Sequence, residues 1–148
     1  MERNLPHRRL PHAELTGAII GAFYDVYNAL GFGFLEQVYV NALAIALERA
    51  GFALERERAY DVHFRDAIVG RYRVDLLVEQ SVLVEVKAAY ALADADRRQV
   101  LNYLRCTGFE VGLLLHFGPM PKFQRIVLRE QLASYRDAAH IDAEARKS

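Results

Sequence analysis

The sequence predicts a single α/β domain with a mixed sheet of four or five strands. Apolar residues recur at helical spacing across residues 13–50, and apolar and charged residues alternate across residues 71–87. A further helical pattern separates this alternating stretch from an apolar run at residues 110–117. A strand, a helix and a strand in this order form a right-handed crossover, so the two flanking strands should pair in parallel. We therefore expect two helices that precede the sheet and a crossover helix on one of its faces.

Length and composition fit one globular domain. The chain has 148 residues, 53% of them hydrophobic, which allows a sizeable core. Its 19 basic and 19 acidic residues give a formal net charge of zero, so overall charge does not support the basic surface typical of nucleic-acid-binding proteins. No apolar run approaches the roughly 18 residues that cross a bilayer, and we expect no membrane association. The N-terminus has no apolar signal segment and Cys106 is the only cysteine, which together favour a cytoplasmic location.

The chain divides into three parts by composition. Residues 1–12 are polar and contain proline, which is typical of a flexible arm. Residues 13–128 carry the helix and strand patterns without an internal repeat. Residues 129–148 are charged and rich in alanine, which predicts a C-terminal helix or tail.

Two helices are expected before the sheet. The first spans 13–30, and Gly31 is a typical C-terminal stop. The second spans about 34–50. It carries Glu36 in its first turn, beside the apolar face that includes Tyr39. On spacing alone, the helix dipole is a sufficient explanation for an acidic residue at this position.

The alternating stretch predicts a hairpin, in whose first strand Val74, Leu76 and Val78 share one face. An edge strand at 53–65 precedes it, followed by a turn at 66–70 that a strand could cross. A turn at residues 79–81 places Val78 opposite Val82 and, in the same register, Asp75 opposite Glu85. Lys87 lies on the same face as Glu85 because the two residues are two apart. Opposed like charges destabilise a sheet, so two carboxylates here suggest a divalent cation between them.

A third helix is expected after the hairpin, with Asp94 as its N-cap and Gly108 as its end. Asp94 and Asp96 suit the helix dipole at its start. Gln99 and Tyr103 lie one turn apart and share a face of this helix. Strands at 110–117 and 123–128 complete the sheet, the last of them at an edge.

The ordered set of these residues resembles the PD-(D/E)xK nuclease superfamily. Within it, the pattern is similar to the GxxExxY family, whose signature matches Gly33, Glu36 and Tyr39, and the stretch at 116–127 looks like that family's last strand region. The resemblance extends over about 14–128 and implies a restriction-endonuclease-like fold. The other residues of the match are Asp75, Glu85, Lys87, Gln99 and Tyr103.

The resemblance also implies a role for each residue. Asp75 and Glu85, helped by the Val86 carbonyl group, would bind Mg²⁺ or Mn²⁺, and Glu36 would complete the acidic cluster directly or through water. Lys87 would orient or activate the attacking water and stabilise charge on the phosphate. Gln99 and Tyr103 would shape the site and contact substrate or metal-bound water.

Three hypotheses follow for the function. The first is a metal-dependent nuclease that hydrolyses phosphodiester bonds, with DNA favoured over RNA as its substrate. The second is a catalytically silent module of the same fold that binds nucleic acid or a protein partner, and a homodimer is compatible with either. The third is a purely structural network of ion pairs at Asp75, Glu85 and Lys87, which need not add stability.

Overall fold

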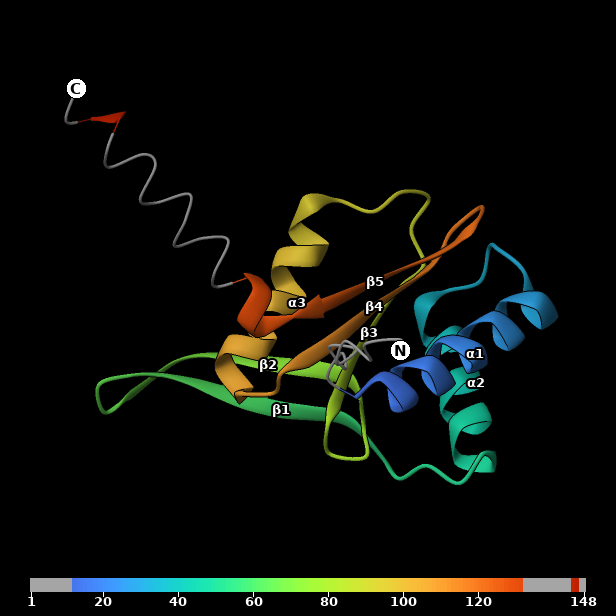
Figure 1. Cartoon of the computed structure of the whole chain (residues 1–148), viewed down its shortest axis with the longest axis horizontal. Helices are drawn as coiled ribbons and strands as arrows, with labels where there is room; N and C mark the ends of the chain where they lie inside the picture. The colour runs from blue at the N-terminus through green and yellow to red at the C-terminus, as the bar shows by residue number, and fades with distance from the viewer. Residues whose placement is uncertain (1–11, 132–144, 147–148) are drawn as a thin grey trace, which may run out of the picture.

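Residues 12–131 and 145–146 are described by the computed structural model, which forms three layers with a five-stranded sheet in the middle (Figure 1). The sheet has the order β1-β2-β3-β4-β5 and is antiparallel except where β3 pairs with β4 in parallel. This confirms the α/β fold and the crossover predicted from the sequence. The elements are α1 (Ala13–Leu30), α2 (Glu36–Arg49), β1 (Leu54–Phe64), β2 (Ala67–Val78), β3 (Val82–Lys87), α3 (Asp94–Thr107), β4 (Val111–Phe117) and β5 (Pro121–Val127).

Helices α1 and α2 cover one face of the sheet. Their apolar stripes are fully buried against the side chains of β2, β3 and β4 that point to the same face. Burial of this much apolar surface is the main favourable contribution to folding. The largest of these buried side chains are Ile19, Phe23, Tyr39, Leu43, Leu47, Leu76, Leu113 and Phe117.

Helix α3 covers the opposite face and approaches β4 closely. Leu83 and Leu114 point toward it, because they alternate with the residues that face α1 and α2. A Cβ atom built on Gly112 would lie 2.7 Å from Cγ1 of Val100, so only glycine allows the helix to pack this close to the strand. This close packing fixes the distance between α3 and the face of the sheet beneath it, and so the distance between side chains that face each other there.

Several predicted boundaries differ from the structure, and strand β5 begins at Pro121 instead of residue 123. Strand β2 begins at Ala67, because a tight turn at Arg65 and Asp66 replaces the longer turn expected at 66–70. Helix α3 has Ala93 as its N-cap, and Asp94 is its first helical residue. Strand β5 lies at the sheet edge, as predicted.

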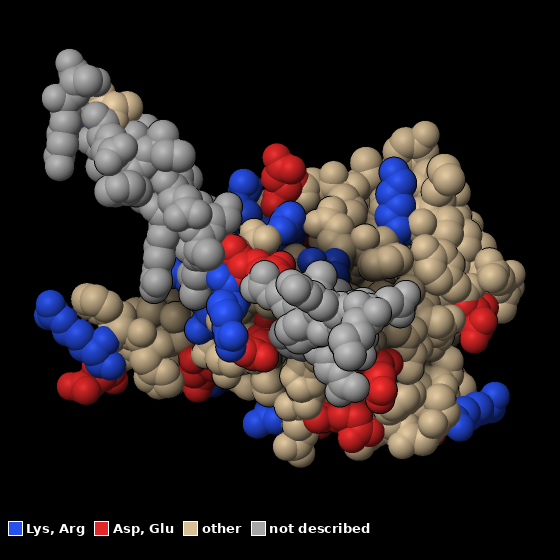
Figure 2. Space-filling model, viewed as in Figure 1, with Lys and Arg blue, Asp and Glu red and all other residues tan. Residues whose placement is uncertain are grey.

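On the face drawn in Figure 2, the described Lys and Arg side chains are interspersed with Asp and Glu and form no continuous basic surface. Over the described residues, no helix has the length and apolar character that a membrane span requires. The predicted N-terminal arm lies outside the described residues except for His12. The predicted C-terminal helix is described only at residues 129–131 and 145–146.

Candidate active site

Asp75 lies where strand β2 changes the face toward which its side chains point. Val74 packs in the cluster beneath α3, whereas Leu76, two residues later, packs beneath α1 and α2. A regular strand would place both on one face, as the sequence pattern predicted. Strand β1, which pairs with β2, is irregular at the same level. Its residue Glu57 lies between the partners of Val74 and Leu76 and has a φ of 51°.

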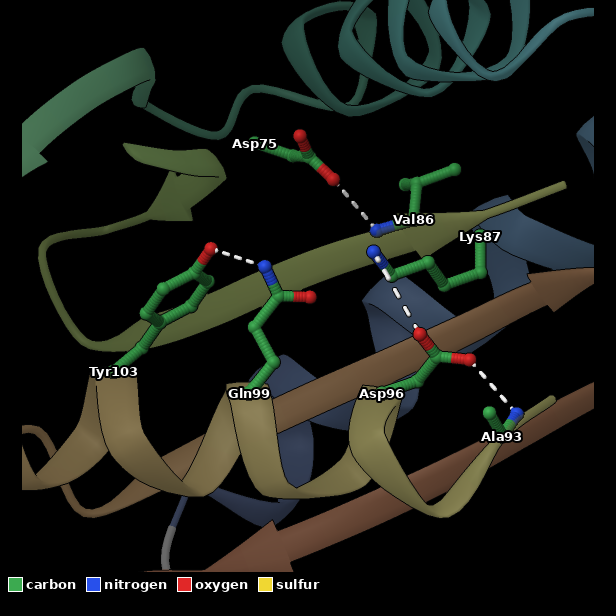
Figure 3. Close-up of polar contacts among 7 residues, drawn as sticks. All are labelled: Asp75, Val86, Lys87, Ala93, Asp96, Gln99 and Tyr103. Atoms are coloured by element: carbon green, nitrogen blue, oxygen red, sulfur yellow. Dashed lines mark hydrogen bonds and ion pairs between the residues drawn. The ribbon is translucent and has the colours of Figure 1, made fainter. Parts of the chain in front are cut away.

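This irregularity frees the Asp75 side chain to take over a strand hydrogen bond. The pairing of β2 with β3 ends at Leu76 and Val84. Beyond it, the Val86 N–H donates to Oδ2 of Asp75 at 2.8 Å (Figure 3). A carboxylate therefore replaces the backbone carbonyl that a regular ladder would supply, and it is held directly over β3.

Glu85 is buried beside Asp75, with only 3% of the residue exposed. Burial raises the pKa of Glu85 to about 9, and both a hydrogen bond to Asp75 and the charge of Asp75 add to the increase. Lys87 acts in the opposite direction. Oε1 of Glu85 has no hydrogen-bond partner among the described residues, so this carboxyl group is poorly satisfied by the protein itself.

Lys87 reaches from β3 toward α3. Its Nζ lies 3.9 Å from Oδ1 of Asp96, and the other carboxylate oxygen of Asp96 accepts a hydrogen bond from the Ala93 N–H at 2.9 Å (Figure 3). The position of Asp96 in the first turn of α3 predicts an interaction with the helix dipole, but not this contact. A signal was present, because Asp96, Gln99 and Tyr103 are spaced by three and four residues and so share one face of α3.

Gln99 and Tyr103 form the rest of that face. Nε2 of Gln99 donates to the Tyr103 hydroxyl oxygen at 2.6 Å, and both side chains point from α3 toward β3 (Figure 3). Burial, and next the charge of Glu85, raises the pKa of Tyr103 above its usual range. The neutral hydroxyl is therefore the stable form beside the carboxyl pair.

Glu36 approaches the same residues from α2. Although the residue as a whole is exposed, partial burial of its carboxyl group, followed by the charge of Asp75, raises the pKa of Glu36. Lys87 and a hydrogen bond from the backbone of Ala88 lower it. The charges of Asp75 on β2 and Lys87 on β3 thus shift the pKa of Glu36, which sequence spacing alone assigned to the helix dipole.

Tyr39 explains why Glu36 is presented in this way. The buried Tyr39 ring stacks on Phe117 at 4.2 Å, and its hydroxyl group donates to the Gly31 carbonyl at 2.6 Å. The same hydroxyl accepts a hydrogen bond from the Phe34 N–H at 3.2 Å. Gly33, between these two residues, has a φ of 120°, which favours glycine. One side chain therefore holds both sides of the connection that leads into Glu36.

Tyr39→Phe should lower the free energy of unfolding by about 1–3 kcal/mol, because it removes one donor and one acceptor from a buried loop. Thermal and urea unfolding would measure the change. Tyr24→Phe is the matched control, since the Tyr24 ring is partly exposed and should tolerate loss of its hydroxyl within about 0.5 kcal/mol. Equal stability of the two variants would contradict a role for Tyr39 in holding the connection.

The structure therefore brings Asp75, Glu85 and Lys87 together, with Glu36, Gln99 and Tyr103 around them. Val86 contributes its N–H to this group, while its side chain is fully buried on the other face. Over the part of the chain that the structure describes, no three His, Cys, Asp or Glu side chains are placed to hold a metal ion on their own. A cation here would need backbone, water or substrate oxygens in addition to carboxylates.

Fold and site together define a nuclease-like α/β domain of the restriction-endonuclease type. The chain belongs to the PD-(D/E)XK nuclease superfamily, because the sequence model of that superfamily matches residues 13–127. No curated protein matches the chain.

Solved structures show the same fold. The match to the crystal structure of SSO0001 has a TM-score of 0.50 and 18% sequence identity. It covers 78% of this chain and 58% of the SSO0001 chain. This chain therefore spans little more than half of SSO0001. A second match is the crystal structure of an alkaline exonuclease, LHK-Exo from Laribacter hongkongensis, with a TM-score of 0.50 and 14% sequence identity. This match covers 91% of this chain and 83% of the LHK-Exo chain.

Proposed function

We propose that this protein is a Mg²⁺- or Mn²⁺-dependent nuclease of the GxxExxY family that hydrolyses phosphodiester bonds in DNA. The observation that carries the proposal is the pair of adjoining carboxyl groups of Asp75 and Glu85, with Lys87 on the same strand as Glu85. Burial of two such groups side by side opposes folding, so their presence together suits a site that binds a cation.

The donor set supports a hard divalent cation. Oε1 of Glu85 is buried without a partner among the described residues, and it is an oxygen ligand of the kind that Mg²⁺ prefers. Asp75 would supply a second ligand, and the Val86 carbonyl group and Glu36 are the further candidates. Mg²⁺ commonly takes only one or two protein carboxylates and keeps several waters, which fits a site with two carboxyl groups in contact. When bound, the cation would promote ionisation of the attacking water and neutralise charge on the phosphate.

The surrounding side chains suit the remaining tasks. Lys87, held at the edge of the site by Asp96, would orient the attacking water and stabilise negative charge on the phosphoryl oxygens. The Gln99 amide and the neutral Tyr103 hydroxyl would donate or accept hydrogen bonds to substrate or water. One structural neighbour is an alkaline exonuclease, so the same fold occurs in a nuclease.

Purified protein should cleave at least one of single-stranded, duplex or branched DNA when Mg²⁺ or Mn²⁺ is added, and RNA tested in parallel should be cleaved more slowly. Lys87→Gln should reduce cleavage by at least roughly 100-fold, because charge stabilisation in the transition state is lost. It should still bind Mn²⁺ in a calorimetric titration. Arg49→Gln removes the same charge from an exposed position at the end of α2 and should leave cleavage unchanged.

Absence of cleavage on all these substrates with either metal would overturn the proposal. Retained binding of nucleic acid or of a protein partner would then favour the catalytically silent module. The three-part division at residues 12 and 128 and the cytoplasmic location also stay predictions, which limited proteolysis and cell fractionation would test.

A further inference from the structure

Large apolar side chains are exposed in a group beside the candidate active site. We call Phe32, Phe34, Leu35 and Tyr90 the aromatic rim. They are 45%, 48%, 81% and 78% exposed, respectively. Single exposed apolar residues are common on protein surfaces, but a local group of them marks a surface that binds something.

The rim joins two connections that are far apart in the sequence. Phe32, Phe34 and Leu35 lie between α1 and α2, and Tyr90 lies between β3 and α3 (Figure 1). The rings of Phe32 and Tyr90 meet edge to face, with centroids 6.4 Å apart and an angle of 71° between their planes. The Phe34 ring packs in a similar way on the buried Tyr39. Phe34 is therefore supported from beneath, whereas Phe32 and Tyr90 support each other.

The rim is continuous with the candidate site. Leu35 immediately precedes Glu36, and Tyr90 follows Lys87 by three residues. A hydrogen bond between the Ala88 backbone and the Glu36 carboxyl group joins the same two connections. The aromatic rim therefore adjoins the carboxyl groups at the connections that carry Glu36 and follow Lys87.

The charge of the chain adds a second argument. A nucleic acid usually gains most of its affinity from contacts between its phosphates and a basic surface. This chain has a formal net charge of zero, and Figure 2 shows no continuous basic surface on the face it draws. Stacking of a base on an aromatic ring contributes about 1–3 kcal/mol per base, needs no positive charge and tolerates any sequence.

We propose that Phe32 and Tyr90 stack on unpaired bases beside the scissile phosphate, so that the protein acts on single strands or frayed ends in preference to closed duplex. Bases within a duplex already stack on each other and reach a protein ring only after unpairing. This inference rests on the proposed function only for the position of the phosphate.

Base-dependent binding tests the proposal. A fluorescent oligothymidylate and an abasic strand with the same number of phosphates are titrated with the full chain carrying Lys87→Gln, in Mg²⁺, so that binding is measured without cleavage. The oligothymidylate should bind at least about tenfold more tightly, the effect of one base stack. Tyr90→Ala and Phe32→Ala should each remove most of this difference, whereas Tyr90→Phe should keep it.

Phe64→Ala is the matched control. Phe64 is 60% exposed, near the turn between β1 and β2, and its loss should not affect binding of either strand. Equal affinities for the two strands, or equal effects of Phe64→Ala and Tyr90→Ala, would overturn the proposal. Self-association through the rim alone would also overturn the proposal. It would appear as a dimer in sedimentation that Tyr90→Ala dissociates without changing base-dependent binding.

The two proposals fail separately. If the protein without Lys87→Gln cleaves single strands and duplex at equal rates and Tyr90→Ala does not alter either rate, the rim proposal is wrong and the nuclease proposal stands. If the protein cleaves nothing but still prefers the oligothymidylate to the abasic strand, the nuclease proposal is wrong and the stacking of bases on the rim stands.

Discussion

Glu85→Gln is expected to stabilise the metal-free protein at alkaline pH while it abolishes cleavage. Burial, with Asp75 alongside, raises the pKa of Glu85 from 4.5 to about 9. The folded protein therefore holds a proton on this group at a pH where the unfolded chain has lost it. Glutamine has the shape of the protonated side chain and no such proton to lose, so the variant avoids this penalty.

The direction of the pH dependence follows from proton binding. Between about pH 4.5 and pH 9 the folded state binds more protons at Glu85 than the unfolded state does, so rising pH favours unfolding. The loss of stability should approach roughly 1 kcal/mol per pH unit within this window, and it should be absent below pH 4.5. Urea unfolding in EDTA at several pH values would measure it. Glu85→Gln should flatten the dependence.

Added metal provides a second readout of the same carboxyl group. A cation favours the ionised form, so Mn²⁺ should raise the melting temperature more at pH 8 than at pH 6. Glu85→Gln should lose this response, whereas Glu48→Gln, at an exposed position on α2, should keep it. A wild-type protein whose stability in EDTA does not fall with pH would show that the two carboxyl groups do not oppose each other.

Much of the fold could be predicted because its determinants are local. The boundaries of α1 match the prediction at both ends, because an apolar stripe and Gly31 define them in the sequence. The pairing of Val78 with Val82 is confirmed as well, since a short turn and a buried face leave only one register. From that register, the sequence predicted that the carboxyl groups of Asp75 and Glu85 lie close together.

The same register failed to predict how Asp75 is placed. Alternation put Val74 and Leu76 on one face, but the structure puts them on opposite faces. The change depends on the irregular backbone at Glu57, in a neighbouring strand, and on the hydrogen bond from Val86. Interactions between strands decide both, and a pattern within one strand cannot contain them.

Asp96 and the hydroxyl group of Tyr39 show a similar limit. Their positions on helix faces could be predicted, but their partners come from β3 and from the connection before α2. The helix dipole and the apolar core are adequate explanations for these two residues in sequence. Only the tertiary structure shows that one of them holds Lys87 and the other supports the segment leading to Glu36.

Asp75→Asn and Asp75→Ala are expected to be equally inactive but to differ in stability. Asparagine keeps an oxygen that can accept the hydrogen bond from the Val86 N–H, whereas alanine leaves this N–H without its partner. Asp75→Ala should therefore be less stable than Asp75→Asn by about 1–3 kcal/mol in the metal-free protein. Asp75→Asn also removes a charge that opposes ionisation of Glu85, so it should be at least as stable as wild type above neutral pH.

Cleavage and metal binding separate this structural role of Asp75 from its proposed chemical role. Both variants should lose at least roughly 100-fold in cleavage and bind Mn²⁺ more weakly by calorimetry, because a carboxylate ligand is absent from each. Asp25→Asn, at an exposed position on α1, should change none of these measurements. If Asp75→Asn kept full activity, the carboxylate would serve only the hydrogen bond to β3. The acidic pair would then be a feature of the strand geometry, and the metal would have to bind elsewhere.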